Sequence, residues 1–265
     1  MNARTNLEPG KITASMLNIP SDLDIPSSTR PYLERLNLTL SANDAMYAGN
    51  DRHYLSCGAS ALEVILLSLR LSGAPEPGTI LDFGAGAGRV TRWLRAAFPH
   101  AQIDACDLRS SDMDFCASTF GASTWISGID LDSLRAPQSY SLIWLGSVAT
   151  HLTADTTKHL IRKMISWCSP GGLVVMSFHG RHALNRQNSG EYFYIDVERW
   201  TVIQRDYEKH GFGYSDYEGQ AGYGISVAKL SWIAAVIEEL RTGRLICLSE
   251  RAWDGHHDVL AVQAG

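Results

Sequence analysis

Short apolar runs alternate with amphipathic segments through the middle of the chain. Five runs are rich in Ile, Leu, Val and Trp and predict buried strands, at 79–84, 101–108, 123–128, 141–147 and 171–179. Apolar residues at helical spacing lie between them, at 89–98, 110–120 and 153–169. Strands that alternate with helices predict a parallel sheet with helices on both faces. The sequence SPGG at 169–172 predicts a turn before the fifth strand.

The pattern changes on both sides of this region. Helical spacing predicts one helix over 54–71 and another over 228–243. Two further apolar runs, 244–251 and 257–263, are separated by a short polar link, which predicts an antiparallel hairpin. The first thirty residues contain Pro and Ser with little periodicity and predict an irregular arm. Residues 180–228 are rich in Tyr and Gly and predict an irregular lid.

A break at "GAPEPG" (73–78) divides the chain. We therefore predict an N-terminal arm and helical cover at 1–72 and one α/β domain at 73–265. The lid would be an insertion in that domain at about 180–228.

The glycine-rich stretch "DFGAGAGRV" (82–90) falls where the first strand should turn into a helix. Glycines allow positive φ and let a ligand lie against bare backbone. A phosphate-binding P-loop needs a Lys after the glycines, which this stretch lacks, and a dinucleotide fingerprint would place the third glycine one residue later. Asp107 ends the second strand, where a carboxylate can accept both hydroxyls of a ribose. Asp130 follows the third strand at the same edge.

Five consecutive motifs resemble those of class I S-adenosylmethionine-dependent methyltransferases in order and spacing. They are "ILDFGAGAG", "IDACDL", "GIDLDSL", "YSLIWLGSVATHL" and "CSPGGLVVMSF", and they cover about residues 78–180. The resemblance implies a Rossmann-like fold with a seven-stranded, mainly parallel sheet and an antiparallel last strand, so that 73–265 would be a methyltransferase domain. "LIWLGSVATHL" and "SFHGR" also look similar to methyltransferases that accompany glycosyltransferases.

The same resemblance implies a site for S-adenosylmethionine, with S-adenosylhomocysteine as the product. The methionine part would lie on the loop of Asp82, Gly84, Gly86 and Gly88. The ribose would bind Asp107 beside Leu108, and the adenine would bind Asp130 with Leu131 against the ring. Asp132 stands close enough in sequence to replace Asp130. Gly146 would lie beside the cofactor's ammonium group, and Arg52 and Tyr54 would close over the cofactor.

Histidines supply candidates for activating an acceptor, because the imidazole pKa lies near neutrality. His151 follows the fourth strand and is the first choice as general base. His179 ends the fifth strand, and His256 and His257 lie in the terminal hairpin, which should approach His179. For each of these histidines, a purely structural role is the alternative. Asp254 or Asp258 could orient one of them.

Two further expectations concern the acceptor side. Tyrosines of the lid supply flat apolar surface with a hydroxyl, and either line an acceptor site or simply pack the lid: Tyr192, Tyr194, Tyr214, Tyr217 and Tyr223. No metal site is predicted, because a histidine-rich group with Asp258 is not the oxygen set that Mg²⁺ prefers.

Composition narrows the function classes. The net charge of −5 and the lack of a basic stripe argue against nucleic-acid binding. Five scattered cysteines without CxxC spacing are typical of reduced thiols, and residues 1–30 lack a signal-peptide layout, so we expect a cytoplasmic protein. Apolar runs are too short to predict a membrane span. The sequence leaves open whether the protein forms a homodimer.

We therefore expect transfer of a methyl group from S-adenosylmethionine to a small-molecule acceptor. A hydroxyl of a sugar, glycoconjugate or natural product is the first choice. The alternatives are an enzyme of the same fold with non-methylating chemistry, such as cyclisation, and a non-catalytic partner subunit. The intact acids Asp107 and Asp130 argue against the last of these.

Overall fold

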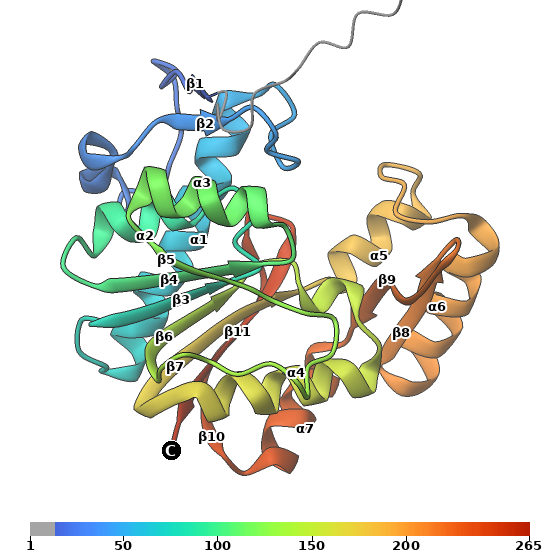
Figure 1. Ribbon diagram of the computed structural model, residues 1–265. Helices are drawn as coiled ribbons and strands as arrows, with labels where there is room; N and C mark the ends of the chain where they lie inside the picture. The colour runs from blue at the N-terminus through green and yellow to red at the C-terminus, as the bar shows by residue number, and fades with distance from the viewer. Residues whose placement is uncertain (1–13) are drawn as a thin grey trace, which may run out of the picture.

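A seven-stranded sheet forms the centre of the computed structural model, which describes residues 14–265 (Figure 1). Its strands, in spatial order, are β10 (Gly243–Trp253), β11 (His257–Ala264), β7 (Cys168–Phe178), β6 (Tyr140–Leu145), β3 (Thr79–Phe83), β4 (Gln102–Asp107) and β5 (Ser123–Ile126). Strands β5, β4, β3, β6 and β7 pair in parallel, and β11 runs antiparallel to β7 and to β10. The predicted sheet and its antiparallel terminal hairpin are confirmed.

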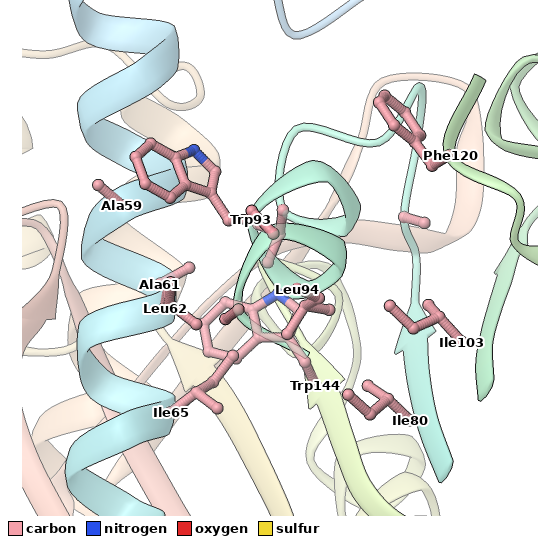
Figure 2. Packing of buried hydrophobic residues seen from close by; sticks show 14 of the residues in the cluster. Ala59, Ala61, Leu62, Ile65, Ile80, Trp93, Leu94, Ile103, Phe120 and Trp144 are labelled. Carbon is pink, nitrogen blue, oxygen red and sulfur yellow. The ribbon is translucent and has the colours of Figure 1, made fainter. Parts of the chain in front are cut away.

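Helices cover both faces of this sheet. One face packs against α1 (Asp51–Ser72), α2 (Thr91–Ala97) and α3 (Ser110–Phe120), and the other against α4 (Ala154–Trp167) and α7 (Leu230–Leu240). Successive strand residues point to opposite faces, so Ile80 lies in the first hydrophobic cluster and Leu81 in the second. Figure 2 shows Ile80, Ile103 and Trp144 of the sheet below Leu94 of α2.

Helix α1 packs closely against α2 because Gly58 has no side chain. A Cβ at Gly58 would lie 2.4 Å from Cδ1 of Trp93, which is fully buried beside α1 (Figure 2). Among the described residues, α1 is the helix whose length and apolar composition would allow it to cross a membrane, and more than half of that stretch is buried inside the protein.

The arm, predicted to be irregular over the first thirty residues, contains one short strand, and the residues that follow it up to α1 add another strand and a 3-10 turn. Strands β1 (Ala14–Met16) and β2 (Thr39–Ser41) pair antiparallel, and a 3-10 turn, η1, spans Arg30–Arg35. The buried Arg92 of α2 donates from Nη1 to the carbonyls of Asn37 (2.8 Å) and Thr39 (3.1 Å). The part of the predicted arm before residue 14 lies outside the described residues.

The prediction that residues 180–228 are irregular is wrong. They form α5 (Arg181–Asn188), α6 (Val197–His210) and the antiparallel hairpin of β8 (Phe212–Tyr217) and β9 (Gln220–Ala228), beside the edge of the sheet (Figure 1). We call this segment the lid. It has a small core of its own, made of Leu184, Ile195, Trp200, Ile203, Tyr207, Ile225 and Val227.

Two glycines inside β8 and β9 are the reason that the sequence did not predict the hairpin of the lid. Gly213 and Gly224 stand inside the strands because other backbone approaches them closely, and not because the chain turns there. A Cβ would lie 2.0 Å from the Ile203 carbonyl oxygen at Gly213 and 1.9 Å from the Ser215 carbonyl oxygen at Gly224. Glycine inside a strand often marks such an approach.

The predicted turn at 169–172 is also wrong. These residues belong to β7, whose register with β6 shifts between Tyr140 and Leu142. Gly171 has φ of 76° at this irregularity. The glycines therefore mark a bulge in a continuous strand.

Candidate functional site

The loop after β3 requires glycine at three positions, and the reason differs among them. Gly84, Gly86 and Gly88 have φ of 77°, 52° and 82°, in the left-handed region that favours glycine. A Cβ at Gly84 would lie 2.5 Å from Cγ2 of Val148, and one at Gly88 would lie 2.4 Å from the Phe120 ring. A Cβ at Gly86 would meet no atom within 4 Å. Packing explains Gly84 and Gly88, whereas Gly86 borders open space in which a ligand can lie.

Asp107 connects this loop to the end of β4. Its Oδ2 accepts the Gly86 N–H at 2.9 Å, and its Oδ1 accepts the Leu108 N–H at 2.7 Å. A carboxylate oxygen can accept more than one hydrogen bond, so both oxygens keep capacity for a ligand. The half-buried carboxylate is thus fixed beside the open space at Gly86.

Asp82 lies beneath the loop. It is 1% exposed, and its Oδ2 accepts the Thr91 hydroxyl at 2.6 Å, which joins β3 to the first turn of α2. Burial raises the pKa of Asp82 to about 7. The structure gives Asp82 this internal role, and its contact with a cofactor stays a prediction.

Two acids follow β5. Asp130 is exposed, and its Oδ1 accepts the N–H of Asp132 at 3.0 Å. Asp132 pairs with His159 of α4, Oδ1 to Nε2 at 3.2 Å. Leu131 packs against the cluster that includes α4. Within residues 14–265 Asp130 has no charged partner, which favours it over Asp132 as the predicted adenine ligand.

The loop after β6 is held in an uncommon conformation. Gly146 lies under Trp253, whose Cη2 would be 2.8 Å from a Cβ there. Ser147 has φ of 59°, which is unusual for a residue other than glycine. Its N–H donates to Ser177 Oγ at 2.8 Å, and its hydroxyl lies 3.1 Å from that of Thr150. Sequence reasoning missed Ser147, because no residue pattern signals this backbone conformation.

His151 follows this loop and contacts the lid. Its Nδ1 lies 2.9 Å from the Gly224 carbonyl oxygen. A carbonyl only accepts, so Nδ1 carries the proton and Nε2 keeps the lone pair. Burial lowers the pKa of His151 below 6.5, partly offset by the Gly224 contact. The ring stacks on Tyr223, with centroids 4.9 Å apart. Among the residues that the structure describes, the hydrogen bonds of His151 involve Nδ1 alone, so the geometry is that of a neutral base with Nε2 available.

The glycine loop, His151 and Asp107 border the same region. Val148, three residues before His151, covers Gly84. Burial raises the pKa of Tyr223, and the charge of Asp107 raises it further, so Tyr223 lies within electrostatic reach of Asp107. The hairpin of the lid thus faces the carboxyl ends of the parallel strands, where the predicted cofactor residues lie.

His179, His256 and His257 also come together, as predicted for the terminal hairpin and β7. Ring centroids are 5.0 Å apart for His179 and His257, 5.4 Å for His179 and His256, and 4.6 Å for His256 and His257. Burial lowers the pKa of all three: well below 6.5 for His179 and His257, and to about 4 for His256. We call them the histidine cluster.

His256 is poorly arranged to act as a base. Arg186 Nη1 lies 3.3 Å from its Nδ1 and can only donate, so the proton of the neutral ring is on Nε2. That N–H donates to the Tyr194 hydroxyl at 3.0 Å. Both nitrogens of His256 are therefore engaged, in contrast to Nε2 of His151.

The tyrosines of the lid divide into groups. Tyr217 and Tyr223 flank His151, and Tyr192 and Tyr194 lie beside His256. Tyr214 donates to Asp216 within the lid hairpin, which supports simple packing for that residue.

The two residues expected to close over the cofactor contact the segment before α1. The hydroxyl of the buried Tyr54 donates to Asp44 at 2.5 Å, and Arg92 lies over its ring. Arg52 pairs with Asp22. Their contact with a cofactor stays a prediction.

Known proteins resemble this chain in its central region. Residues 81–174 match the family model described as a methyltransferase domain. A malonyl-[acyl-carrier protein] O-methyltransferase of Halalkalibacterium halodurans is 28% identical over 128 residues, which are 46% of this chain and 46% of that protein. The chain spans about half the length of the curated relatives it matches.

Solved structures extend the likeness of the fold. An S-adenosylmethionine-dependent methyltransferase from Clostridium acetobutylicum superposes with a TM-score of 0.54 at 12% identity, covering 78% of this chain and 91% of that one. CalS10, an amino pentose methyltransferase from Micromonospora echinaspora, gives 0.53 at 13% identity, covering 79% and 92%. Residues 81–174 therefore resemble a methyltransferase domain, and the described chain has the fold seen in an S-adenosylmethionine-dependent methyltransferase.

Proposed function

We propose that this protein transfers the methyl group of S-adenosylmethionine to an oxygen atom of a small-molecule acceptor, with a hydroxyl of a sugar, glycoconjugate or natural product as the first choice. The observation that carries the proposal is the tautomer of His151, which the Gly224 carbonyl fixes so that the lone pair is on Nε2. His151 comes three residues after Val148, which covers Gly84 of the glycine loop.

The residues around Gly86 fit the cofactor. Open space beside Gly86 can receive the methionine part, and the anchored carboxylate of Asp107 can accept the ribose hydroxyls. Asp130, at the next strand end, has a carboxylate that can accept from the adenine amino group. When bound, the cofactor supplies an electrophilic methyl group on a sulfonium, which is a good leaving group.

The chain's own part in the reaction is alignment and proton removal. His151 Nε2 takes the proton of the acceptor hydroxyl as its oxygen bonds to the methyl carbon. When bound, the cofactor would supply the methyl group and leave as S-adenosylhomocysteine, with the electron pair of the carbon–sulfur bond kept by sulfur. The Gly224 carbonyl accepts from Nδ1–H throughout and stabilises the imidazolium that forms.

The acceptor would lie between the sheet edge and the lid. Aromatic rings on the lid side, those of Tyr217 and Tyr223, offer flat apolar surfaces with hydroxyls, which suit a sugar or phenol ring. The structural relative CalS10 is named for an amino pentose, which is consistent with a sugar acceptor.

Binding and turnover test the proposal separately. Calorimetric titration with S-adenosylmethionine and S-adenosylhomocysteine should give micromolar affinity that Asp107→Ala weakens by roughly 10- to 100-fold or more. Formation of S-adenosylhomocysteine is then followed with panels of sugars, glycosides and phenols, and the methylated product is identified by mass spectrometry. Cofactor binding with conversion but without a methylated product would favour the non-methylating alternative. Absence of cofactor binding to the pure, cofactor-free protein would refute the assignment.

A further inference from the structure

The histidine cluster has the donor set of a transition-metal site. One ring nitrogen from each of His179, His256 and His257 can be chosen so that all three lie within 4.8 Å of one another. Imidazole nitrogens are ligands for zinc and other first-row transition metals, whereas Mg²⁺ prefers oxygen. The cluster differs from the magnesium sites considered from the sequence, because no carboxylate belongs to it.

The spacing of the rings agrees with one central ion. Metal–nitrogen bonds of about 2.0–2.1 Å place each ring centre about 3 Å from a zinc ion, and tetrahedral angles then separate two ring centres by about 5 Å. The three observed centroid distances are 4.6, 5.0 and 5.4 Å. The three nitrogens, which lie within 4.8 Å of one another, would have to approach to about 3.3 Å around a tetrahedral ion.

Two buried nitrogens in the cluster lack partners. His179 is 5% exposed, and its Nδ1 makes no hydrogen bond within residues 14–265; the same holds for Nδ1 of His257. A buried polar atom without a partner is costly, and such atoms in a folded protein call for an explanation.

We propose that His179, His256 and His257 bind one divalent transition-metal ion of the zinc class. Three protein ligands leave a fourth position of a tetrahedral ion open, as in catalytic rather than structural zinc sites. The Tyr194 hydroxyl lies beside this group, 3.0 Å from His256 Nε2. The site would join the end of β7 to the terminal hairpin, and it does not depend on the proposed methyl transfer.

Arg186 controls access to His256. It donates to Nδ1 of His256, and that bond must break if His256 coordinates through Nε2, because Nδ1 then carries the proton. Arg186 keeps other partners, an ion pair with Glu191 at 3.0 Å and the face of the Tyr192 ring. Its positive charge opposes a second cation, so removing that charge should strengthen metal binding.

Metal binding to the full chain tests the proposal without any assay of activity. Chelator-treated protein is titrated with Zn²⁺ in a calorimeter, and the visible spectrum of the Co²⁺ form reports the coordination geometry. We expect one ion per chain and a tetrahedral Co²⁺ spectrum. His257→Ala should weaken Zn²⁺ binding by more than the about 10- to 100-fold typical of a lost outer-shell partner. His210→Ala, at an exposed histidine of α6, should leave the affinity unchanged.

A second variant keeps the proposal testable if His257→Ala does not fold. Arg186→Gln keeps all three imidazoles and should bind Zn²⁺ more tightly than the wild type, with a larger rise of the unfolding midpoint on Zn²⁺ addition. No stoichiometric binding by the wild type, or equal affinity in the wild type and both variants, would overturn the proposal.

Discussion

The Nδ1 atom of His151 lies 2.9 Å from the carbonyl oxygen of Gly224, and this contact joins the loop after β6 to β9 of the lid. A second bond supports it, because the buried Ser226 hydroxyl donates to the Ala149 carbonyl at 3.0 Å. The lid thereby fixes both the position and the tautomer of the histidine that we assign as the base.

Replacing His151 tests that assignment. We expect His151→Gln to lower kcat/KM by about 100- to 10,000-fold, the usual contribution of a general base. The affinity for S-adenosylmethionine should stay within about twofold, because the predicted cofactor residues are untouched. Product formation and calorimetric titration measure the two quantities. His100→Gln, at an exposed histidine, serves as the matched control. Equal loss of binding and turnover would indicate a structural role for His151 instead.

The pH dependence of the rate should report the same residue. The neutral form of His151 is active, and burial lowers its pKa below 6.5. The rate should therefore hold as the pH falls to 6.5 and decline only below that value. This acid limb should disappear from the residual activity of His151→Gln. A decline centred above pH 6.5 in the wild type would contradict a base in this environment.

Asp107 should dominate cofactor affinity. Its carboxylate is fixed by the N–H groups of Gly86 and Leu108, and charged hydrogen bonds of about 1.5–3 kcal/mol would be lost to the ribose on substitution. Asp107→Ala should therefore weaken S-adenosylhomocysteine binding by roughly 10- to 100-fold or more. Asp114→Ala, an exposed acid on α3, should bind like the wild type. Retained affinity in Asp107→Ala would show that the ribose lies elsewhere.

The centre of the sheet could be predicted from the sequence because β3, β4 and β6 are short apolar runs, each followed by a clear helical pattern. Burial on both faces imposes that pattern on Thr79–Phe83 and on Tyr140–Leu145. The strands of the lid could not be predicted from the sequence. Gly213 and Gly224 occupy strand positions because another part of the backbone lies too close for a side chain, and this contact exists only in the folded protein. The local pattern of apolar and polar residues contains no information about such tertiary contacts.

For the candidate site, the positions of the residues could be predicted from the sequence, but their hydrogen-bond partners could not. Strand ends predicted the places of Asp107, Asp130 and His151, because the carboxyl ends of parallel strands meet at one edge. The tautomer of His151 depends on the Gly224 carbonyl, 73 residues away in the chain, and the engagement of His256 depends on Arg186. A residue type can be read from the sequence, whereas the partner that sets its protonation is supplied by the fold.

The packing of α1 on α2 makes a prediction about stability. Gly58→Ala would place a Cβ 2.4 Å from Trp93 Cδ1 and 2.7 Å from the Arg89 carbonyl oxygen. Overpacking of this kind costs about 1–3 kcal/mol in the free energy of unfolding. Gly78→Ala is the control, since a Cβ there meets no atom within 4 Å. Urea unfolding measures both variants, and equal midpoints would show that α1 and α2 separate easily.

Asp82 should make stability fall as the pH rises from about 4 to 7. Its pKa is about 7 in the folded protein and near 3.8 when the chain is unfolded, so the folded state binds the extra proton in this window. Each pH unit between these values then costs up to about 1.4 kcal/mol. Asp82→Asn cannot titrate, and its amide oxygen can still accept the Thr91 hydroxyl. The unfolding free energies of wild type and variant, measured in urea at several pH values, should therefore shift in favour of the variant as the pH rises, on top of a constant offset from the buried amide. A difference that does not vary with pH would mean that Asp82 is ionised in the folded protein throughout, and that water or a bound ligand reaches it beneath the glycine loop.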